Sequence, residues 1–111
     1  MGSFDWRRGQ DGPLFSIEGL RVFGYGPGDQ PAFRSLLRMV PEEERKAFLE
    51  LTHSAMDRST VLATDIHARL VDGRQRIVHI EAEPEFNEHG NLVGYTGIVQ
   101  DVTDRRLAED R

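Results

Sequence analysis

A chain of 111 residues is long enough for one domain with its own core, and its 38% hydrophobic and 30% charged residues exclude a disordered segment. The formal net charge of -5 argues against nucleic acid as a main partner, because binding to phosphates requires a basic surface. The absence of cysteine excludes disulfides, thiolate catalysis, cysteine-based zinc sites and a flavin–cysteine adduct.

The first part of the chain predicts a hairpin followed by a short helix. Residues 4–7 alternate apolar and polar side chains, which is typical of a half-buried strand. A turn rich in Gly and Pro at residues 9–13 leads to a second extended stretch at residues 14–15. Ser16 can cap a short helix, and Gly24 can end it with a positive φ.

Two further helices are predicted before the spacing of the apolar residues changes from that of a helix to that of a strand. The apolar residues that follow Pro31 are spaced as on one helical face: Phe33, Leu36, Leu37 and Val40. Pro41 suits the first turn of the next helix, and the acidic residues 42–44 complement the positive end of its dipole. This helix should run to about Arg58, and its inner face should contain Phe48, Leu51, Thr52, Ala55, Met56 and Ser59.

The second half predicts three antiparallel strands and an exit helix. Apolar and polar residues alternate at 65–70, and Asp72-Gly73 is a strong hairpin turn. The next strand should point inward with Val78, Ile80, Ala82 and Phe86. After a turn at residues 87–91, a last strand runs from Leu92 to about Val102, and Thr103 can cap the helix. We therefore expect an α+β fold with the helices packed on one sheet face.

Three segments of this pattern resemble the PAS domain family. Residues 16–25, with their Phe-Gly-Tyr end, resemble the early PAS helix, and residues 69–73 are similar to a family hairpin. The specific match is residues 97–109, Gly-Ile-Val-Gln-Asp-Val-Thr-Asp-Arg-Arg-Leu-Ala-Glu, which are similar to the PAC ending almost residue for residue. The resemblance runs from Trp6 to Glu109 and implies a five-stranded antiparallel sheet with helices on one face, around a small cavity.

The resemblance also implies a role in bacterial signal transduction. Such domains usually precede histidine kinase, diguanylate cyclase or phosphodiesterase modules, so we expect residues 1–103 to be a PAS/PAC sensory domain and residues 104–111 to begin a linker helix. The expected partners are a second copy, in a homodimer, and a downstream effector domain that carries the catalysis. The chain has no apolar run of roughly 20 residues and no signal sequence, so we expect a cytoplasmic protein without a membrane segment.

The interior of such a fold defines a candidate ligand pocket. We expect its lining to contain Phe33, Leu36, Val40, Phe48, Leu51, Met56, Val78, Ile80, Tyr95, Gly97 and Val99. A packed core without a ligand would need the same residues, so the presence of a small molecule stays open. Gly97 in the middle of a strand leaves room for a ligand or for a closely packed element.

The resemblance does not identify a cofactor. Light-sensing relatives use a cysteine and a glutamine to bind flavin, and here cysteine is absent and Val99 stands at the glutamine position. Haem-binding relatives use a histidine of the long helix. His53 lies about 130–140° around that helix from the apolar stripe, so we expect it to face solvent. The family often has a His-Pro pair where this chain has Val40-Pro41, and often a Trp where this chain has Ile77. These differences leave the class of ligand undefined.

Asp101, Thr103 and Arg105 form a candidate signal-coupling group. The resemblance implies that Asp101 on the last strand pairs with Arg105 in the first helical turn, so that movement of the strand turns the helix. On the outer sheet face His67, Arg69, His79 and Glu81 should lie together, but two histidines of unverified register assign no metal.

Two other functions remain open at this point. The first is a small cone-shaped α+β enzyme with Asp65, His67 and Glu81 as acid–base groups. Against it, two strands precede the helices, and the polar trio faces away from the apolar side. The second is a purely structural dimerisation domain, which the sequence does not separate from a sensory one.

Overall fold

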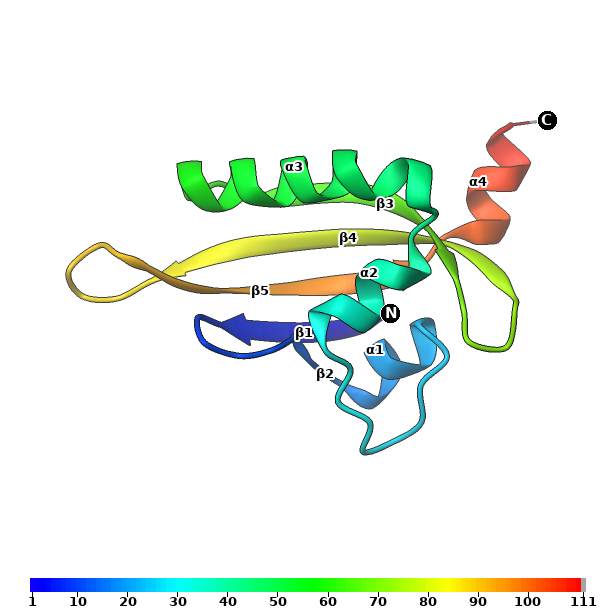
Figure 1. The fold of residues 1–111 in the computed structure, drawn as a ribbon, viewed down its shortest axis with the longest axis horizontal. Helices are drawn as coiled ribbons and strands as arrows, with labels where there is room; N and C mark the ends of the chain where they lie inside the picture. Colours follow the sequence, from blue (N-terminus) through cyan, green and yellow to red (C-terminus); the bar gives the residue numbers. More distant parts are fainter. Residues whose placement is uncertain (111) are drawn as a thin grey trace.

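The alternating segments form one five-stranded antiparallel sheet in the computed structural model, which describes residues 1–110. The strands lie in the order β2-β1-β5-β4-β3, so the first strand of the chain pairs with the last (Figure 1). Their bounds are β1 (Gly2–Arg7), β2 (Leu14–Phe15), β3 (Leu62–Arg69), β4 (Gln75–Phe86) and β5 (Leu92–Asp101). The predicted N-terminal hairpin is present, since Phe4 of β1 pairs with Phe15 of β2.

Three helices cover one face of the sheet, and a fourth leaves the end of β5 (Figure 1). They are α1 (Ile17–Val22), α2 (Phe33–Met39), α3 (Glu42–Arg58) and α4 (Thr103–Glu109). Ser16 caps α1 by accepting a hydrogen bond from the Gly19 N–H, and Gly24 follows with a φ of 81°. Ser16 and Gly24 thus mark the start and the end of α1, as the sequence predicted. The expected α+β fold class is also confirmed.

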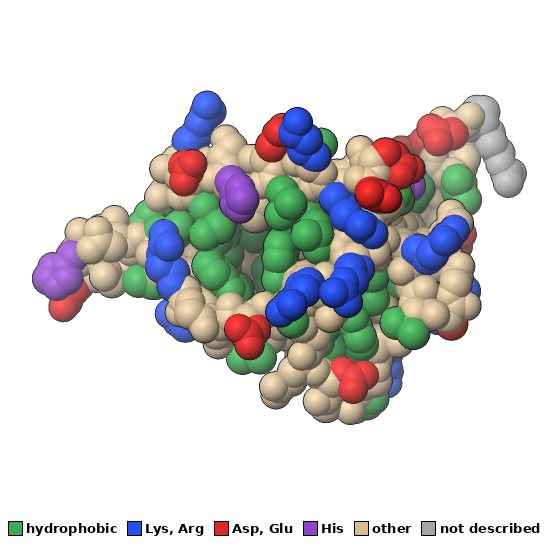
Figure 2. Space-filling view, viewed as in Figure 1, with side chains coloured by type: hydrophobic (Ala, Val, Ile, Leu, Met, Phe, Trp, Pro, Cys, Tyr) green, Lys and Arg blue, Asp and Glu red, His purple; other side chains and the backbone are tan. Residues whose placement is uncertain are grey.

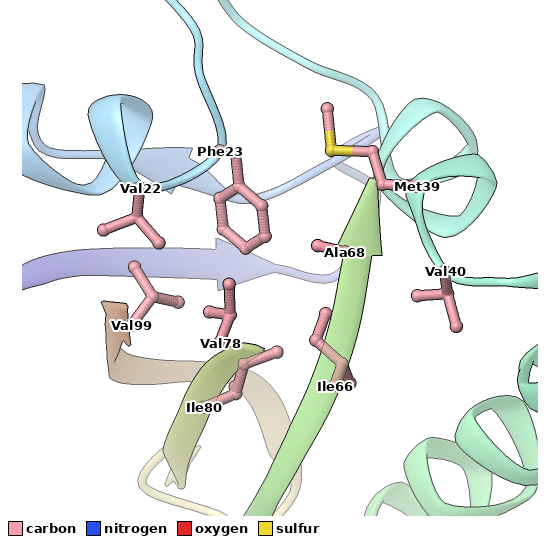
Figure 3. Packing of buried hydrophobic residues seen from close by; sticks show 9 residues of the cluster. All are labelled: Val22, Phe23, Met39, Val40, Ile66, Ala68, Val78, Ile80 and Val99. Atoms are coloured by element: carbon pink, nitrogen blue, oxygen red, sulfur yellow. The ribbon is translucent and has the colours of Figure 1, made fainter. Parts of the chain in front are cut away.

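The main core lies between the sheet and α1 and α2. Figure 3 shows Val22 and Phe23 at the end of α1 facing Val78 and Val99 of the sheet. Met39 and Val40 approach the same cluster from the end of α2, and the remaining members come from β3 and β4: Ile66, Ala68 and Ile80. Burial of these apolar side chains is the main force that holds the helices to the sheet.

Several boundaries differ from the predicted ones. Phe86 is 49% exposed and does not point inward, because the pairing of β4 with β5 shifts register between Glu85 and Phe86. Pro41 is the N-cap residue of α3 and precedes its first turn. The exit helix already begins at Thr103, and Arg111 of the expected 104–111 linker lies outside the described residues. Across residues 1–110, no helix is both long and apolar enough to span a bilayer.

Candidate functional site

An apolar pocket of about 360 Å³ lies between the sheet and the helices α2 and α3. In the space-filling view, hydrophobic side chains gather in a hollow on this face, below α3 (Figure 2). The structure places eight of the eleven expected residues in its lining: Phe33, Leu36, Val40, Phe48, Met56, Ile80, Tyr95 and Val99. Pockets of about 300–1,000 Å³ are the size that small organic ligands occupy.

The other three expected residues do not line the pocket. Leu51 is 41% exposed, because the face of α3 that meets the sheet carries Ala55 and its neighbours. Val78 is fully buried in the main core. Gly97 offers no ligand space either, since a Cβ there would collide with the Glu81 carbonyl and lie 2.9 Å from the Phe4 ring. Of the two roles considered for this glycine, the structure selects close packing.

One wall of the pocket comes from the N-terminal segment, which the predicted set did not include. Phe4 and Trp6 of β1, Phe15 of β2 and Phe23 after α1 all line the pocket. The alternation of residues 4–7 was a signal that Phe4 and Trp6 share one face. What the sequence did not reveal is that β1 lies beside β5, which brings this face over the cavity.

The polar groups of the pocket are already engaged within the protein. The Tyr95 hydroxyl lies 2.9 Å from the carbonyl oxygens of both Ala55 and Thr60, and the Thr52 hydroxyl donates to the Phe48 carbonyl at 2.9 Å. Burial raises the pKa of Tyr95, which keeps the hydroxyl protonated as a donor. Throughout residues 1–110, no buried side-chain nitrogen or oxygen lacks a partner. The interior therefore presents an apolar surface to any occupant.

The mouth of the pocket is more polar than its interior. Gln10 and Asp11 of the β1–β2 turn border it, and the Phe33 N–H donates to the Asp11 carbonyl at 2.8 Å. His53 is exposed, as its helical angle predicted, but it also borders the pocket, which that angle did not predict. The pocket lies under the apolar stripe of α3, where Phe48, Ala55 and Met56 line it, and it also extends to the neighbouring side of the helix, where His53 lies.

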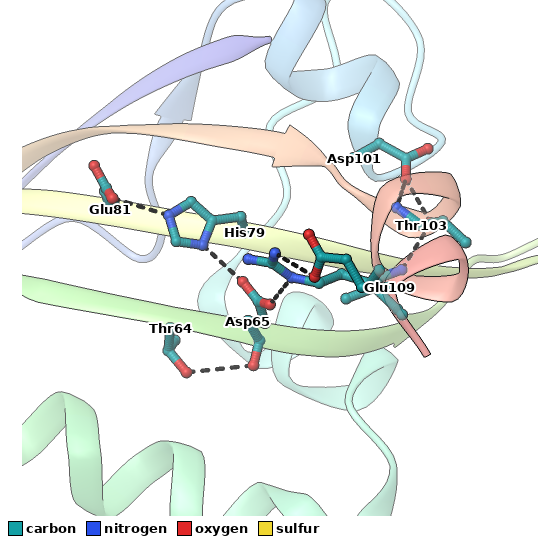
Figure 4. Close-up of polar contacts among 9 residues, drawn as sticks. Thr64, Asp65, His79, Glu81, Asp101, Thr103 and Glu109 are labelled. Atoms are coloured by element: carbon teal, nitrogen blue, oxygen red, sulfur yellow. Dashed lines mark hydrogen bonds and ion pairs between the residues drawn. The ribbon is translucent and has the colours of Figure 1, made fainter. Parts of the chain in front are cut away.

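The second part of the site is the junction at which β5 passes into α4. Asp101 Oδ1 accepts hydrogen bonds from the backbone N–H of Thr103, at 3.0 Å, and from its hydroxyl (Figure 4). The Thr103 hydroxyl oxygen accepts in turn from the Ile77 N–H at 2.9 Å. Thr103 is thus the first residue of α4 and not its cap. Its hydroxyl ties the helix to β4.

The expected ion pair of Asp101 with Arg105 is not formed. Asp101 Oδ2 instead lies 3.4 Å from Nε of Arg76 on β4, whose Nη1 donates to the carbonyls of Arg21 and Val22 at 2.8 and 2.7 Å. Arg76 therefore joins the C-terminal end of α1, strand β4 and the end of β5. Arg105 is exposed on α4.

The neighbouring arginine makes the contact between α4 and the sheet. Arg106 Nε lies 2.6 Å from Asp65 Oδ2 on β3, and Asp65 Oδ1 lies 2.7 Å from Nδ1 of His79 on β4. Nε2 of the same imidazole lies 3.0 Å from Glu81 (Figure 4). We call Asp65, His79, Glu81 and Arg106 the outer-face network. Sequence reasoning missed Arg106, since adjacent arginines at the start of a helix look alike.

The outer-face network has perturbed protonation equilibria. The hydrogen bond from Arg106 lowers the pKa of Asp65, and the hydrogen bonds to Glu81 and then Asp65 raise the pKa of His79. Both carboxylates are acceptors only, so His79 can satisfy both bonds only as the doubly protonated imidazolium. The structure does not bring Asp65, His67 and Glu81 together as an acid–base trio, because His67 bonds Glu44 of α3 at 2.8 Å. Among the described residues, no group of three or more His, Asp or Glu side chains is arranged so that it could hold a metal ion.

His79 should make folding stability depend on pH. A raised folded-state pKa means that its contribution is fully present below the ordinary value of 6.5 and is lost as pH rises through the folded pKa. Chemical denaturation between pH 6 and 9 should therefore show a larger stability loss for the wild type than for His79→Gln. His53→Gln, which changes an exposed histidine of α3 on the other side of the sheet, should retain the wild-type loss. Parallel curves for the wild type and His79→Gln would contradict the assignment.

Comparisons with known proteins agree with this fold. A family model described as PAS fold matches residues 14–107. A sensory box histidine kinase/response regulator from Burkholderia thailandensis superposes with a TM-score of 0.78 at 21% identity, over 98% of this chain and 82% of that one. The N-terminal domain of a diguanylate cyclase with PAS/PAC sensor from Marinobacter aquaeolei superposes with a TM-score of 0.84 at 9% identity, over 95% and 97%.

A domain of a putative light and redox sensing histidine kinase from Haloarcula marismortui is also similar, with a TM-score of 0.74 at 18% identity, over 92% of this chain and 89% of that one. Among curated proteins, none matches the sequence. The solved structures are too distant in sequence to show more than the fold, whereas the family model spans most of the chain. The protein therefore belongs to the PAS fold family.

Proposed function

We propose that this domain is a cytoplasmic sensory or relay module. It binds a small apolar molecule and passes the resulting conformational change to an effector domain through α4. The observation that carries the proposal is the pocket of about 360 Å³ whose interior is apolar and whose interior polar groups, the hydroxyls of Tyr95 and Thr52, are already paired within the protein. A charged or strongly polar ligand would lose its hydration there without gaining hydrogen-bond partners. An aliphatic or aromatic ligand loses nothing of this kind and gains apolar contact.

The junction of β5 and α4 supports the relay part of the proposal. Tyr95 and Val99 line the pocket on β5, and the same strand ends at Asp101, which holds the first residue of α4. A ligand that displaces β5 therefore also displaces the start of the exit helix. A homodimer and a downstream kinase, cyclase or phosphodiesterase domain complete the proposal, in line with the signalling proteins whose domains share this fold.

The exposed acidic and histidine side chains do not favour an enzyme. Asp65 and Glu81 engage His79 on the outer face of the sheet, opposite to the pocket, and His67 pairs with Glu44. Acid–base catalysis needs its groups around a concave site where a substrate is held. We therefore place any catalysis in a downstream domain.

Binding of the neutral dye Nile red, measured by fluorescence titration, tests the pocket. Ala82 lines the pocket and is 2% exposed, so the variant Ala82→Leu places extra methyl groups inside the cavity. We expect it to weaken Nile red binding at least about tenfold, which corresponds to about 1.4 kcal/mol. Thr96→Leu is the matched control, because Thr96 is exposed on the outer face of the adjacent strand.

Two results would contradict the proposed ligand class. One is equal Nile red affinity in the wild type and in Ala82→Leu, and the other is no binding by the wild type. Native mass spectrometry of the freshly purified protein adds an independent measurement. A persistent adduct that Ala82→Leu loses and Thr96→Leu keeps would identify the natural occupant of the pocket.

A further inference from the structure

The body of helix α4 is held to the domain by one side chain. Only Thr103 and Arg106 are partly buried among its seven residues, and no residue of the helix is fully buried. Thr103 lies at the first position, so it fixes where the helix starts but not its direction. Leu107, the next residue, is 52% exposed.

The seven residues of α4 taken alone would not form a stable helix, because isolated helices of fewer than about 12–15 residues are marginal in water. Contacts with the sheet therefore contribute to the order of residues 103–109. Its backbone hydrogen bonds start with Arg106 N–H donating to the Val102 carbonyl at 2.9 Å. The Arg106 guanidinium then reaches across to β3 and bonds Asp65 Oδ2 at 2.6 Å, while its Nη1 lies 3.3 Å from Glu109.

The partner of Arg106 is itself held in position. Asp65 Oδ1 lies 2.7 Å from Nδ1 of His79, whose other nitrogen lies 3.0 Å from Glu81. Asp65 and His79 are also register partners on adjacent strands, which fixes the distance between them. The carboxylate thus faces α4 as a preorganised docking group.

We propose that Asp65 and Arg106 form a latch that sets the direction of α4 and connects it to strand β3. This route is separate from the Asp101–Thr103 junction on β5. Asp65 precedes Ile66, and His79 precedes Ile80, and both isoleucines line the pocket on the opposite face of the sheet. A ligand in the pocket that shifts β3 or β4 therefore also moves the contact between Asp65 and Arg106. This link between the ligand and α4 rests on the proposed function.

The latch itself is tested without any ligand, by hydrogen exchange of the α4 amides in the complete chain. Arg106→Gln and Asp65→Asn should each lower the protection of these amides about fivefold, as expected for a charged pair whose side chains are each 32% exposed. Arg106→Lys, which keeps the charge, should restore part of the protection. The amides of β5 should be unaffected, which shows that the domain remains folded.

Two control variants separate the latch from a general effect of charge. Arg105→Gln removes the adjacent arginine, which is exposed, and Glu109→Gln removes the partner of Arg106 within the helix. Both should leave the protection of α4 within about twofold of the wild type. Unchanged protection in Arg106→Gln and Asp65→Asn, or an equal loss in Arg105→Gln, would overturn the latch. Loss of Nile red binding in Ala82→Leu is measured separately, so either proposal can fail alone.

Discussion

Gly97→Ala should lower the free energy of unfolding by about 3 kcal/mol, because backbone atoms of β4 already occupy the space that the new side chain needs. A Cβ at this position would collide with the backbone carbonyl of Glu81 and would lie 2.8 Å from the Ala82 Cα. These are backbone atoms of the neighbouring strand β4, so they can move aside only if strands β4 and β5 separate. Gly97→Val should be more damaging still, because it adds two methyl groups to a Cβ that already lies 2.9 Å from the Phe4 ring.

The measurement is chemical and thermal denaturation followed by circular dichroism. For a domain of this size, a loss of about 3 kcal/mol lowers the melting temperature by more than about 10 °C. Thr96→Val is the matched control, since the adjacent residue is exposed and a β-branched side chain suits a strand. A Gly97→Ala variant as stable as Thr96→Val would show that β4 and β5 can adjust around a side chain.

Arg76→Met should lower the free energy of unfolding by about 2 kcal/mol, because it removes charged hydrogen bonds to the backbone. The Arg76 guanidinium donates to the Arg21 and Val22 carbonyls at the end of α1, and its side chain is only 20% exposed. Methionine keeps the apolar stem of the side chain, so the loss reports on the charged head. The loss should appear as a lower denaturant midpoint with an unchanged m-value.

Arg74→Met is the control for this prediction. Arg74 pairs with Asp72 at 2.7 Å, but the two side chains are 59% and 53% exposed and belong to the same turn. Solvent screens exposed pairs of this kind, so the control should stay close to the wild type. If both arginine variants lost the same stability, the contact of Arg76 with α1 would contribute no more to folding than an exposed ion pair does.

The Arg76 variant should also disturb the junction of β5 and α4. Its Nε lies 3.4 Å from Asp101, whose other oxygen holds the first residue of α4. Asp101 therefore receives contacts from both sides of the junction. The resemblance to the family implied a coupling role for this aspartate, and the structure changes its partner from the helix arginine to an arginine of the sheet.

Local patterns predicted the elements of this fold well. Alternation marked β3 and β4, and Ser16 and Gly24 bounded α1, because strand and helix periods determine which side chains share a face. Asp72-Gly73 marked the β3–β4 turn, where Gly73 has a φ of 88°. These signals depend on neighbouring residues only, and a single sequence contains them in full.

The candidate site was predictable only in part. The apolar stripes of α2 and α3 placed Phe33, Phe48 and Met56 on the interior side, where they line the pocket. The same argument was wrong for Leu51, which is 41% exposed. An apolar stripe shows which residues share one face of a helix, but it does not show which part of that face contacts the sheet. The N-terminal wall was missed, since nothing local indicates that β1 pairs with β5.

By itself, the sequence determined the kind and order of the elements, the apolar face of each, and the family resemblance of the last strand and exit helix. Tertiary structure alone decided which distant groups meet: Arg76 reaches a carbonyl 55 residues away, and Arg106 reaches Asp65 across 41 residues. Arg105 and Arg106 are chemically identical neighbours, and one residue turns a helix by about 100°. Which of the two faces the sheet therefore depends on how α4 is rotated about its own axis, and the burial of Val102 at its N-cap is a tertiary contact that no local pattern contains.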